Sequence, residues 1–458
     1  MESAPQDSRP LRVLVLGGSS FMGLCFIKNV LERWPNSVVH HLNRGNDYWN
    51  HEIQNTHKKY GDRINHLKCN RKKRTKFIKV IEGTAESIAE AASLNLKDDI
   101  IWDIVADFSC YIPSDMRTSM IAFRQIKLGT YVYISTDSVY EVTQAKYKET
   151  ELSDDDSYET VDSVHSFDSY SSSSSSDSIS YTIERRDDEE LRSNPEYFTE
   201  DGLIKEGYGF HNKRNNRFRD YLSTMDAYGF EKLTAENILA QKCKDKHKYI
   251  ILRLPDVIGP YDDSGRFWVL VIKMMALIQL KQSDSSKGKF DILKFKFDQE
   301  EESKHMSIVS SVDVSNLLQI IALNSYNQNE QFLACCNQIY NMTSQENLSL
   351  KSLHSIIFDN LVGKEAELSF DSFWERDESS KNTYPSVHCG PICSQKLLDA
   401  FSDLGYSPQT CEKSVIQAAE FFREATCLSS DLKLTSPFMD ELETPIDKCN
   451  KIQRKIFC

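Results

Sequence analysis

A tyrosine and a lysine near the middle of the chain have the types and spacing of an acid–base pair. Tyr228 and Lys232 lie in the segment 226–241, whose apolar spacing predicts a helix, and residues four apart share one helical face. A free phenol has a pKa of about 10, too high for proton transfer near neutrality, but a nearby ammonium group favours the phenolate. The pair therefore has the chemistry to take a hydroxyl proton as hydride leaves a carbinol carbon. The alternative is an aromatic–lysine pair on the surface with no chemical role.

A glycine-rich turn early in the chain predicts an anion site. The apolar run 13–16 is typical of a strand buried on both faces of a parallel sheet, and 21–33 has the apolar spacing of a helix. A strand, a glycine turn and a helix in this order direct free backbone N–H groups and the positive end of the helix dipole at a phosphate. An ordinary strand-to-helix turn is the alternative.

This turn keeps two of the three glycines of the dinucleotide-binding fingerprint. In G-x-G-x-x-G, Gly18 and Gly23 match, and Ser20 stands at the middle glycine. We therefore expect the phosphates of a dinucleotide to meet the turn and the first residues of the helix. These residues are Gly17, Gly18, Ser19, Ser20, Phe21, Met22 and Gly23.

Residues at the ends of three further predicted strands complete the expected cofactor site. The strand 38–42 ends in Asn43 and Arg44, about 20 residues past the glycines, where a carboxylate suits NAD and an arginine suits the 2′-phosphate of NADP. Arg44 favours NADP over NAD, unless it is a solvated loop arginine. The strands 64–69 and 99–107 lead into the other expected residues, which are Asn70, Arg71 and Phe108.

The composition limits the partners of the chain. Among 458 residues, 55 are Lys or Arg and 68 are Asp or Glu, and the net charge of -13 opposes generic nucleic-acid binding. The basic run 70–74 is the one feature that favours RNA. No apolar run has the length of a membrane span, and residues 1–10 lack the apolar core of a secretory signal. We expect a cytoplasmic protein with no membrane partner and, because its 12 cysteines lack metal-ligand spacing, no metal site.

The order of the predicted strands and helices indicates an α/β fold. Strands that alternate with helices predict a doubly wound parallel Rossmann sheet with a smaller C-terminal α+β substrate-binding part. The stretch 149–206 is rich in serine and acidic residues with few aliphatic ones, so we expect a disordered insertion there. The expected division is a tail 1–10, a Rossmann part 11–148, the insertion 149–206, the Tyr-x-x-x-Lys helix with the sixth strand 207–260, the C-terminal part 261–428 and a tail 429–458.

Taken together, these motifs resemble those of the extended short-chain dehydrogenase/reductases, the NAD-dependent epimerase/dehydratase family. The matching features are the glycine turn, Thr136 after the fifth strand, and the Tyr228-Gly-Phe-Glu-Lys232 motif. Within the family, the stretches GGSSFMG, NRG, DFSCY and GPYDDSGRFW are most similar to the atypical branch that includes the chloroplast stem-loop-binding proteins. The resemblance covers roughly residues 11–140 and 208–428 and leaves out the serine-rich insertion.

The resemblance implies roles for four side chains. Tyr228 is the acid/base, Lys232 favours its phenolate and holds the nicotinamide ribose, and Thr136 hydrogen-bonds the substrate oxygen. Asp137 stands where some family dehydratases carry a carboxylate. Ser138 replaces the glutamate that follows it in those dehydratases, which argues against sugar 4,6-dehydration.

The resemblance also implies an enzyme class and its partners. It predicts an NAD(P)-dependent oxidoreductase or epimerase that uses NADP or NAD and acts on a polar small molecule such as a nucleotide sugar. The relatives often dimerise through the Tyr-x-x-x-Lys helix, and the oligomeric state of this chain stays open between a monomer and such a homodimer. Atypical members can keep the fold and lose turnover. A weakly catalytic or non-catalytic cofactor-binding scaffold, or an RNA-associated protein, is therefore the alternative.

Overall fold

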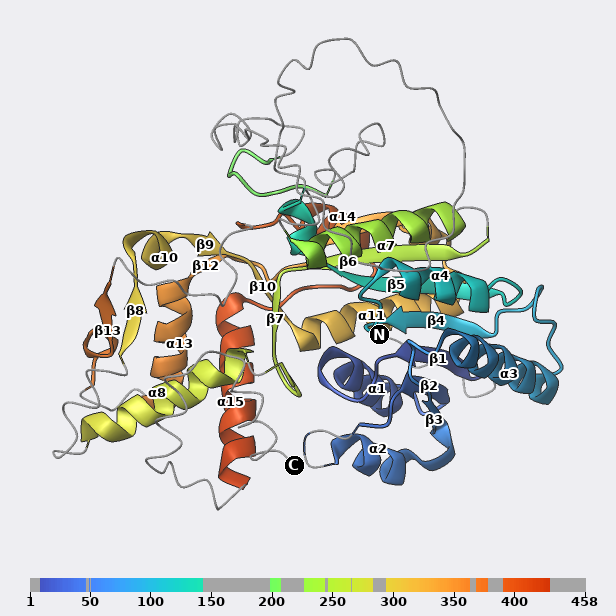
Figure 1. Ribbon diagram of the computed structural model, residues 1–458, viewed down its shortest axis with the longest axis horizontal. Helices are drawn as coiled ribbons and strands as arrows, with labels where there is room; N and C mark the ends of the chain where they lie inside the picture. Colours follow the sequence, from blue (N-terminus) through green and yellow to red (C-terminus); the bar gives the residue numbers. More distant parts are fainter. Residues whose placement is uncertain are drawn as a thin grey trace, which may run out of the picture.

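The structure is a computed structural model, which describes residues 9–46, 49, 51–142, 198–206, 226–243, 246–264, 266–282, 294–362, 368–377 and 390–428. The predicted tail 429–458 and most of the predicted insertion 149–206 lie outside these residues. The described residues form two parts, a large sheet with helices on both faces and a smaller group of helices and short strands beside it (Figure 1).

Seven parallel strands form the central sheet, in the order β11-β6-β5-β4-β1-β2-β3. They are β1 (Leu11–Leu16), β2 (Ser37–Asn43), β3 (Ile64–Lys68), β4 (Trp102–Asp107), β5 (Leu128–Thr136), β6 (Lys248–Leu254) and β11 (Gln338–Asn341). The order reverses direction between β1 and β4, and ligands of such sheets bind at the carboxyl ends of the strands beside this reversal. This topology confirms the predicted doubly wound parallel Rossmann sheet.

Helices cover both faces of the sheet, which explains why its central strands are apolar along their whole length. Two of these helices pack together over one face and three over the other. They are α1 (Phe21–Arg33) and α11 (Ser311–Tyr326), and α3 (Arg74–Ala92), α4 (Pro113–Ala122) and α7 (Ala227–Cys243). In β1, Val13 and Val15 enter the first core and Leu14 and Leu16 enter the second, so every residue of the strand is buried.

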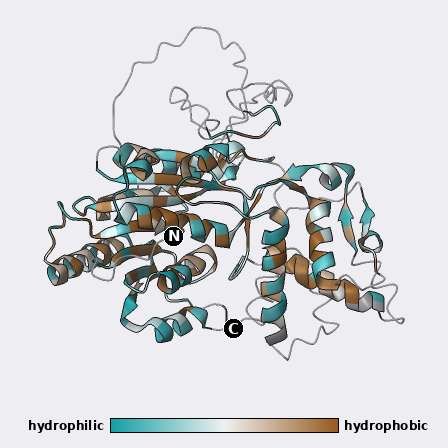
Figure 2. Ribbon diagram, turned by 180° about the vertical axis from the view of Figure 1, so that it is seen from behind, coloured by the Kyte–Doolittle hydropathy of each residue, from teal (hydrophilic) through white to brown (hydrophobic). Residues whose placement is uncertain are grey.

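The smaller part has a hydrophobic core of its own. Three helices, α8 (Arg266–Gln282), α13 (Leu350–Val362) and α15 (Cys411–Leu428), pack around Trp268, Phe358 and Phe422. In Figure 2, α8 is coloured mainly as hydrophobic, as expected for a helix that contributes much of this core. Short strands flank the helices: β8 (Phe295–Phe297) pairs with β13 (Trp374–Arg376), and β9 (His305–Met306) pairs with β12 (Leu348–Ser349).

The chain passes between the two parts more than once. It leaves the sheet through β7 (Asp256–Ile258) and returns through β10 (Ile308–Ser310), and these two strands pair in parallel. The returning chain forms α11, which packs on α1, and β11, which extends the sheet beyond β6. Residues well after 261, in α11 and β11, therefore belong to the layers of the central sheet.

The remaining described elements are short. They are α2 (Glu52–Tyr60), η1 (Gly61–Arg63), η2 (Asp137–Tyr140), α10 (Gln299–Ser303), α12 (Glu330–Ala334), η4 (Phe370–Ser372) and α14 (Gln395–Phe401). None of the helices in the described part of the chain combines the length and the apolar character that a membrane span requires.

Candidate active site

The glycine turn between β1 and α1 is as tight as the sequence predicts. Gly17 has a φ of +100°, and a Cβ atom on Gly23 would lie 2.4 Å from the carbonyl oxygen of Gly17. Both positions therefore require glycine, because any side chain would strain the turn or separate the strand from the helix. Ser20 has a φ of -151°, an extended conformation that does not require glycine, so a serine replaces the middle fingerprint glycine without backbone strain.

The N-terminus of α1 has the geometry of a phosphate site, but two of its donors already have partners. The backbone N–H of Phe21 donates to the carbonyl oxygen of Tyr261 (2.8 Å), and the Ser20 hydroxyl donates to Asp263 Oδ2 (3.0 Å). The glycine turn thus fits the close approach of a dinucleotide phosphate. The first N–H group of the helix is instead bonded to a segment that follows β7.

Phe108 and the residues after it lie against this turn. Its backbone N–H donates to the carbonyl oxygen of Leu16 (2.9 Å), which joins the carboxyl ends of β4 and β1. The sequence did not single out Tyr111, which follows shortly after and is 55% exposed. Loss of water around this tyrosine and the charge of Asp263 raise the pKa of Tyr111, and its exposure to solvent moderates the shift. The DFSCY motif was the available signal, since it contains this tyrosine.

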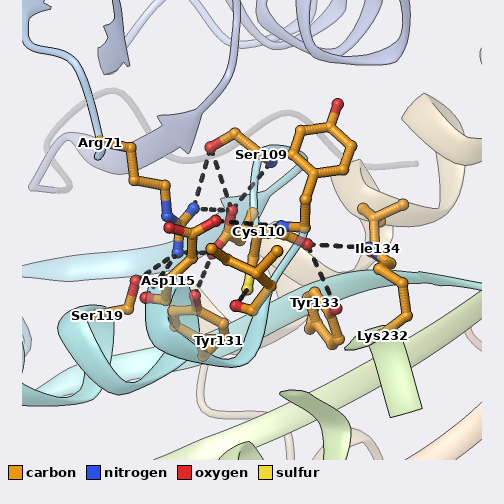
Figure 3. A network of polar contacts seen from close by, with 12 residues as sticks. Arg71, Ser109, Cys110, Asp115, Ser119, Tyr131, Tyr133, Ile134 and Lys232 are labelled. Atoms are coloured by element: carbon orange, nitrogen blue, oxygen red, sulfur yellow. Dashed lines mark hydrogen bonds and ion pairs between the residues drawn. The ribbon is translucent and has the colours of Figure 1, made fainter. Parts of the chain in front are cut away.

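Lys232 is a buried cation held by neutral oxygens. Its Nζ donates to the carbonyl oxygens of Cys110 (3.0 Å) and Ile134 (2.6 Å), as the right-hand side of Figure 3 shows. The side chain is 3% exposed, and burial lowers the pKa of Lys232 to about 8. An ammonium group has three N–H donors; two of them meet these carbonyls, and the centre of the Tyr133 ring lies 4.5 Å from Nζ.

Tyr228 lies in the first turn of α7, where two neighbours position it. The carboxylate of Asp226 accepts a hydrogen bond from the backbone N–H of Tyr228 (3.0 Å), as an N-cap residue does. A Cβ atom on the next residue, Gly229, would lie 2.3 Å from the carbonyl oxygen of Ser138. The glycine inside the Tyr-x-x-x-Lys motif therefore allows the helix to approach η2 closely, and this brings Tyr228 toward Thr136 and Asp137.

The electrostatic surroundings of Tyr228 differ from those the sequence suggested. The ammonium nitrogen of Lys232 is 6.0 Å from the centre of the Tyr228 ring and is bonded to carbonyls. Loss of water around the hydroxyl and the neighbouring Tyr111 and Asp137 raise the pKa of Tyr228. Because 44% of the residue is exposed, water moderates this shift. Tyr228 is thus a protonated phenol near neutral pH, which can act as a proton donor before it acts as a base.

Thr136 and Asp137 form a compact polar group at the end of β5. Thr136 Oγ1 accepts from the backbone N–H of Ser138 and donates to Asp137 Oδ1, each at 3.2 Å. Burial, together with the nearby carboxylate of Asp256, raises the pKa of Asp137 to about 8. Asp256 itself forms an ion pair with Arg266 (3.6 Å). Asp137 is therefore a neutral carboxylic acid at neutral pH, and Asp256 is a contributor that the sequence did not reveal.

Arg71 is placed differently from the cofactor residue that the sequence suggested. Its guanidinium is buried and donates to both carboxylate oxygens of Asp107 (2.5 and 2.8 Å) and to Ser119 Oγ (2.6 Å) and Ser109 Oγ (3.0 Å), as the left-hand side of Figure 3 shows. Burial alone would lower the pKa of Arg71, but the Asp107 charge raises it. The Arg71 guanidinium therefore holds Asp107, the last residue of β4, in place. Asn70 is likewise occupied locally, since its Oδ1 accepts from the backbone N–H of Lys72 (3.0 Å).

Asn43 and Arg44 lie at the end of β2 beside a group of histidines. Asn43 Oδ1 accepts from the backbone N–H of Gly45 (2.7 Å) and contacts His66 Nε2 (2.9 Å), while its Nδ2 contacts His41 Nδ1 (2.9 Å). Burial and the neighbouring imidazoles lower the pKa of His41 to about 2, so the histidine is neutral. These contacts fix Asn43, and Arg44 is exposed at the next position.

Comparisons with known proteins identify the fold. No family model and no curated protein matches the sequence. The structure is similar to a dTDP-glucose 4,6-dehydratase from Bacillus anthracis in complex with NAD, with a TM-score of 0.51 and 12% identity over 90% of this chain and 97% of that one. It is also similar to the Bordetella bronchiseptica enzyme WbmG in complex with NAD, with a TM-score of 0.50 and 9% identity over 92% and 96% of the two chains. The fold is thus that of the NAD-dependent epimerases and dehydratases, and at these identities the likeness extends to the fold alone.

Proposed function

We propose that the protein is an NAD(P)-dependent oxidoreductase or epimerase acting at a carbinol carbon of a polar small molecule. The observation that carries the proposal is the placement of Lys232. Its ammonium group is held at the carboxyl ends of β4 and β5, beside Tyr228 on the same helix, in a sheet whose first strand ends in the tight glycine turn. These are the positions from which a ribose hydroxyl, a substrate hydroxyl and a diphosphate are bound together.

Each side chain of the site has a separate task in this proposal. A bound nicotinamide would accept and return the hydride. Tyr228 exchanges the proton of the substrate hydroxyl, and Lys232 bonds the nicotinamide ribose with its remaining N–H and stabilises the phenolate. The Thr136 hydroxyl exchanges its bond to Asp137 Oδ1 for one to the substrate oxygen, since it has a single hydrogen to donate. Asp137, kept neutral by burial, is a second proton donor beside Thr136.

The proposed substrate class is nucleotide sugars, and the proposed cofactor is NADP before NAD. Neighbouring folds are found in a dTDP-glucose dehydratase with NAD bound. Arg44, exposed at the end of β2, provides a positive charge for a 2′-phosphate. Dimerisation through α7 and residence in the cytoplasm belong to the same proposal.

A dinucleotide-binding scaffold without turnover is the second candidate. Two observations favour it: the raised pKa of Tyr228, which opposes the phenolate, and the bonds that Tyr261 and Asp263 already make to the N-terminus of α1. A scaffold would bind the cofactor through the sheet and leave the tyrosine idle.

One experiment separates the two candidates. The full chain is first titrated with NADH and NADPH by fluorescence. UDP- and dTDP-linked hexoses are then screened with either oxidised cofactor, with absorbance reporting the reduced cofactor and chromatography reporting epimerised sugar. Turnover that is lost in Tyr228→Phe and kept in Tyr326→Phe supports the enzyme, because the Tyr326 hydroxyl donates to the carbonyl of Arg9 away from the site. Cofactor binding with no turnover across the panel supports the scaffold.

A further inference from the structure

The segment 259–264, which follows β7, is bonded to the beginning of α1. We call it the closing segment. The carbonyl oxygen of Tyr261 accepts from the backbone N–H of Phe21 (2.8 Å), and the Tyr261 hydroxyl accepts from Lys28 Nζ (2.6 Å). Asp263 Oδ2 accepts from the Ser20 hydroxyl (3.0 Å). Three hydrogen bonds thus join this segment to the first turns of one helix, across 243 residues of sequence in the Ser20–Asp263 pair.

The backbone at this contact is held in an unfavourable conformation. Phe21 has a φ of +45° and Tyr261 a φ of +64°, both in the left-handed region that residues with a side chain rarely adopt. Such residues persist where the surrounding structure determines them, and they gather at ligand sites and switches. Here the two left-handed residues are the two partners of one hydrogen bond, so breaking that bond would release strain on both sides.

The position of this contact gives it a consequence for binding. The first N–H groups of a helix that follows a glycine turn are the donors that a dinucleotide phosphate uses. In this chain a backbone carbonyl takes the first of those donors, and a carboxylate bonded to the adjacent Ser20 brings a negative charge to the same end of the helix. The negative charge of the Asp263 carboxylate would repel a diphosphate bound at this end of the helix.

We infer that the closing segment occupies the phosphate-binding position at the N-terminus of α1, which we call the phosphate seat. We also infer that Asp263 sets the affinity of this position for a dinucleotide. This inference rests on the proposed function, because it takes the seat to be that of a dinucleotide. It also explains the departure from the fingerprint, since Ser20 stands where the middle glycine is expected and its hydroxyl is the group that binds Asp263. A dinucleotide enters by displacing both contacts.

The aspartate before Asp263 shapes the turn inside the closing segment. Asp262 is fully buried, and its carboxylate accepts from the backbone N–H of Ser264 (2.8 Å). Asp263, the next residue, makes its bond outward to α1. Two adjacent aspartates therefore have opposite tasks, one fixing the turn of the segment and the other closing the seat.

Three variants of the full chain test the inference. Asp263→Asn removes the charge but keeps an oxygen that can accept from Ser20, whereas Asp263→Ala removes both. Glu90→Gln, on the exposed face of α3, is the matched control for loss of one negative charge. Fluorescence titration with NADH and NADPH should show about tenfold tighter binding for Asp263→Asn than for the parent chain, and at least as large a gain for Asp263→Ala. The control should bind like the parent.

Hydrogen exchange tests the closed contact without any dinucleotide. In the parent chain the Phe21 amide should be protected by its bond to Tyr261, and in Asp263→Ala it should exchange about tenfold faster or more. The Leu24 amide, bonded to the Ser20 carbonyl within the helix (3.1 Å), is the internal reference and should not change. Thermal unfolding of each variant checks that the fold is intact.

The outcomes separate this inference from the proposed function. If the parent and Asp263→Asn bind NADH and NADPH equally well, the seat is not closed by Asp263, while the dinucleotide site stands. Rapid exchange of Phe21 in the parent chain overturns the closed contact in the same way. If no variant binds either dinucleotide, including Asp263→Ala with an exposed Phe21 amide, the proposed function and this inference both fail.

Discussion

Two buried cations on either side of Cys110 are stabilised in opposite ways (Figure 3). Arg71 is neutralised by the carboxylate of Asp107, which raises its pKa against the effect of burial. Lys232 is bonded to two carbonyl oxygens, and burial lowers its pKa to about 8. The arginine is bonded directly to a carboxylate, whereas the lysine is bonded to carbonyl oxygens and lies 4.5 Å from the centre of the Tyr133 ring. Chemistry at this edge of the sheet is therefore expected from the lysine.

The largest expected effect tests the structural side of this comparison. Arg71→Met leaves Asp107 buried without its cation and should lower the free energy of unfolding by about 3–5 kcal/mol, as measured by urea titration. The double variant Arg71→Met, Asp107→Leu removes both charges and should recover part of that loss, because the buried Tyr131 hydroxyl loses its acceptor in Asp107. A single variant as stable as the parent chain would show that Arg71 is not the counterion on which Asp107 depends.

The pH dependence of stability tests the other cation. Below pH 8, Lys232 is protonated in the folded and unfolded chain alike. Between pH 8 and about 10.5 the unfolded chain binds the proton and the folded chain does not, so stability should rise with pH. A shift from 10.5 to about 8 corresponds to a gain of up to about 3 kcal/mol over this range. Burial also lowers the pKa of Lys273 to about 8, so that lysine adds a rise of its own. Lys232→Met, titrated with urea at the same pH values, should therefore show a smaller rise than the parent chain; parallel curves for the two proteins would contradict the assignment.

Removing the Tyr228 hydroxyl tests whether the Tyr228–Lys232 pair serves catalysis. With a substrate in hand, Tyr228→Phe should lower turnover by about 10²-fold or more, because a positioned acid–base group contributes at least that much. The dissociation constant of the cofactor should change little, since the phenol acts on the substrate. Lys232→Ala should weaken both turnover and cofactor binding. Turnover that survives Tyr228→Phe would move the proton path elsewhere, with Asp137 as the next group to substitute.

The smallest effect concerns an exposed cation. Arg44 should make NADPH bind about tenfold more tightly than NADH, since a charge-assisted hydrogen bond to the 2′-phosphate is worth about 1.5–3 kcal/mol. Arg44→Asp should narrow or reverse this preference in parallel fluorescence titrations. Arg124→Asp, an equal charge change at an exposed site near the end of α4, is the control and should leave the preference unchanged. Equal affinities of the parent chain for both cofactors would remove the basis for the prediction.

Local patterns were sufficient to predict the type of sheet and its first strands, but not that β11 would extend it. The run 13–16 and the helix 21–33 correspond to β1 and α1, because periodicity and the glycine turn are properties of neighbouring residues. Local patterns do not indicate where α3 begins. It starts at Arg74, inside the basic run 70–74, and in its first turn only Phe77 is buried in the core, so the apolar spacing of a helix is weak there.

The partners of the site residues could not be predicted from local patterns. Arg71 meets Asp107 across 36 residues, and nothing near Arg71 indicates that its guanidinium turns inward. Ser20 meets Asp263 across 243 residues, so its departure from glycine had no visible cause. Tertiary pairing of this kind depends on the topology, which places the closing segment over the glycine turn. Local patterns therefore indicate which residue types to expect at the candidate site, whereas the contacts of those residues depend on the tertiary fold.

The late return of the chain through β10 has a consequence for synthesis on the ribosome. β6 remains an open edge until β11 is made, and α1 lacks its covering helix until α11 is made. An unpaired strand edge and an uncovered apolar helix face are the features that lead nascent chains to aggregate. A fragment that ends after β6 would expose both surfaces. We therefore do not expect the part of the sheet up to β6 to fold as an independent domain, and shortened versions for crystallisation should retain the chain at least through α14.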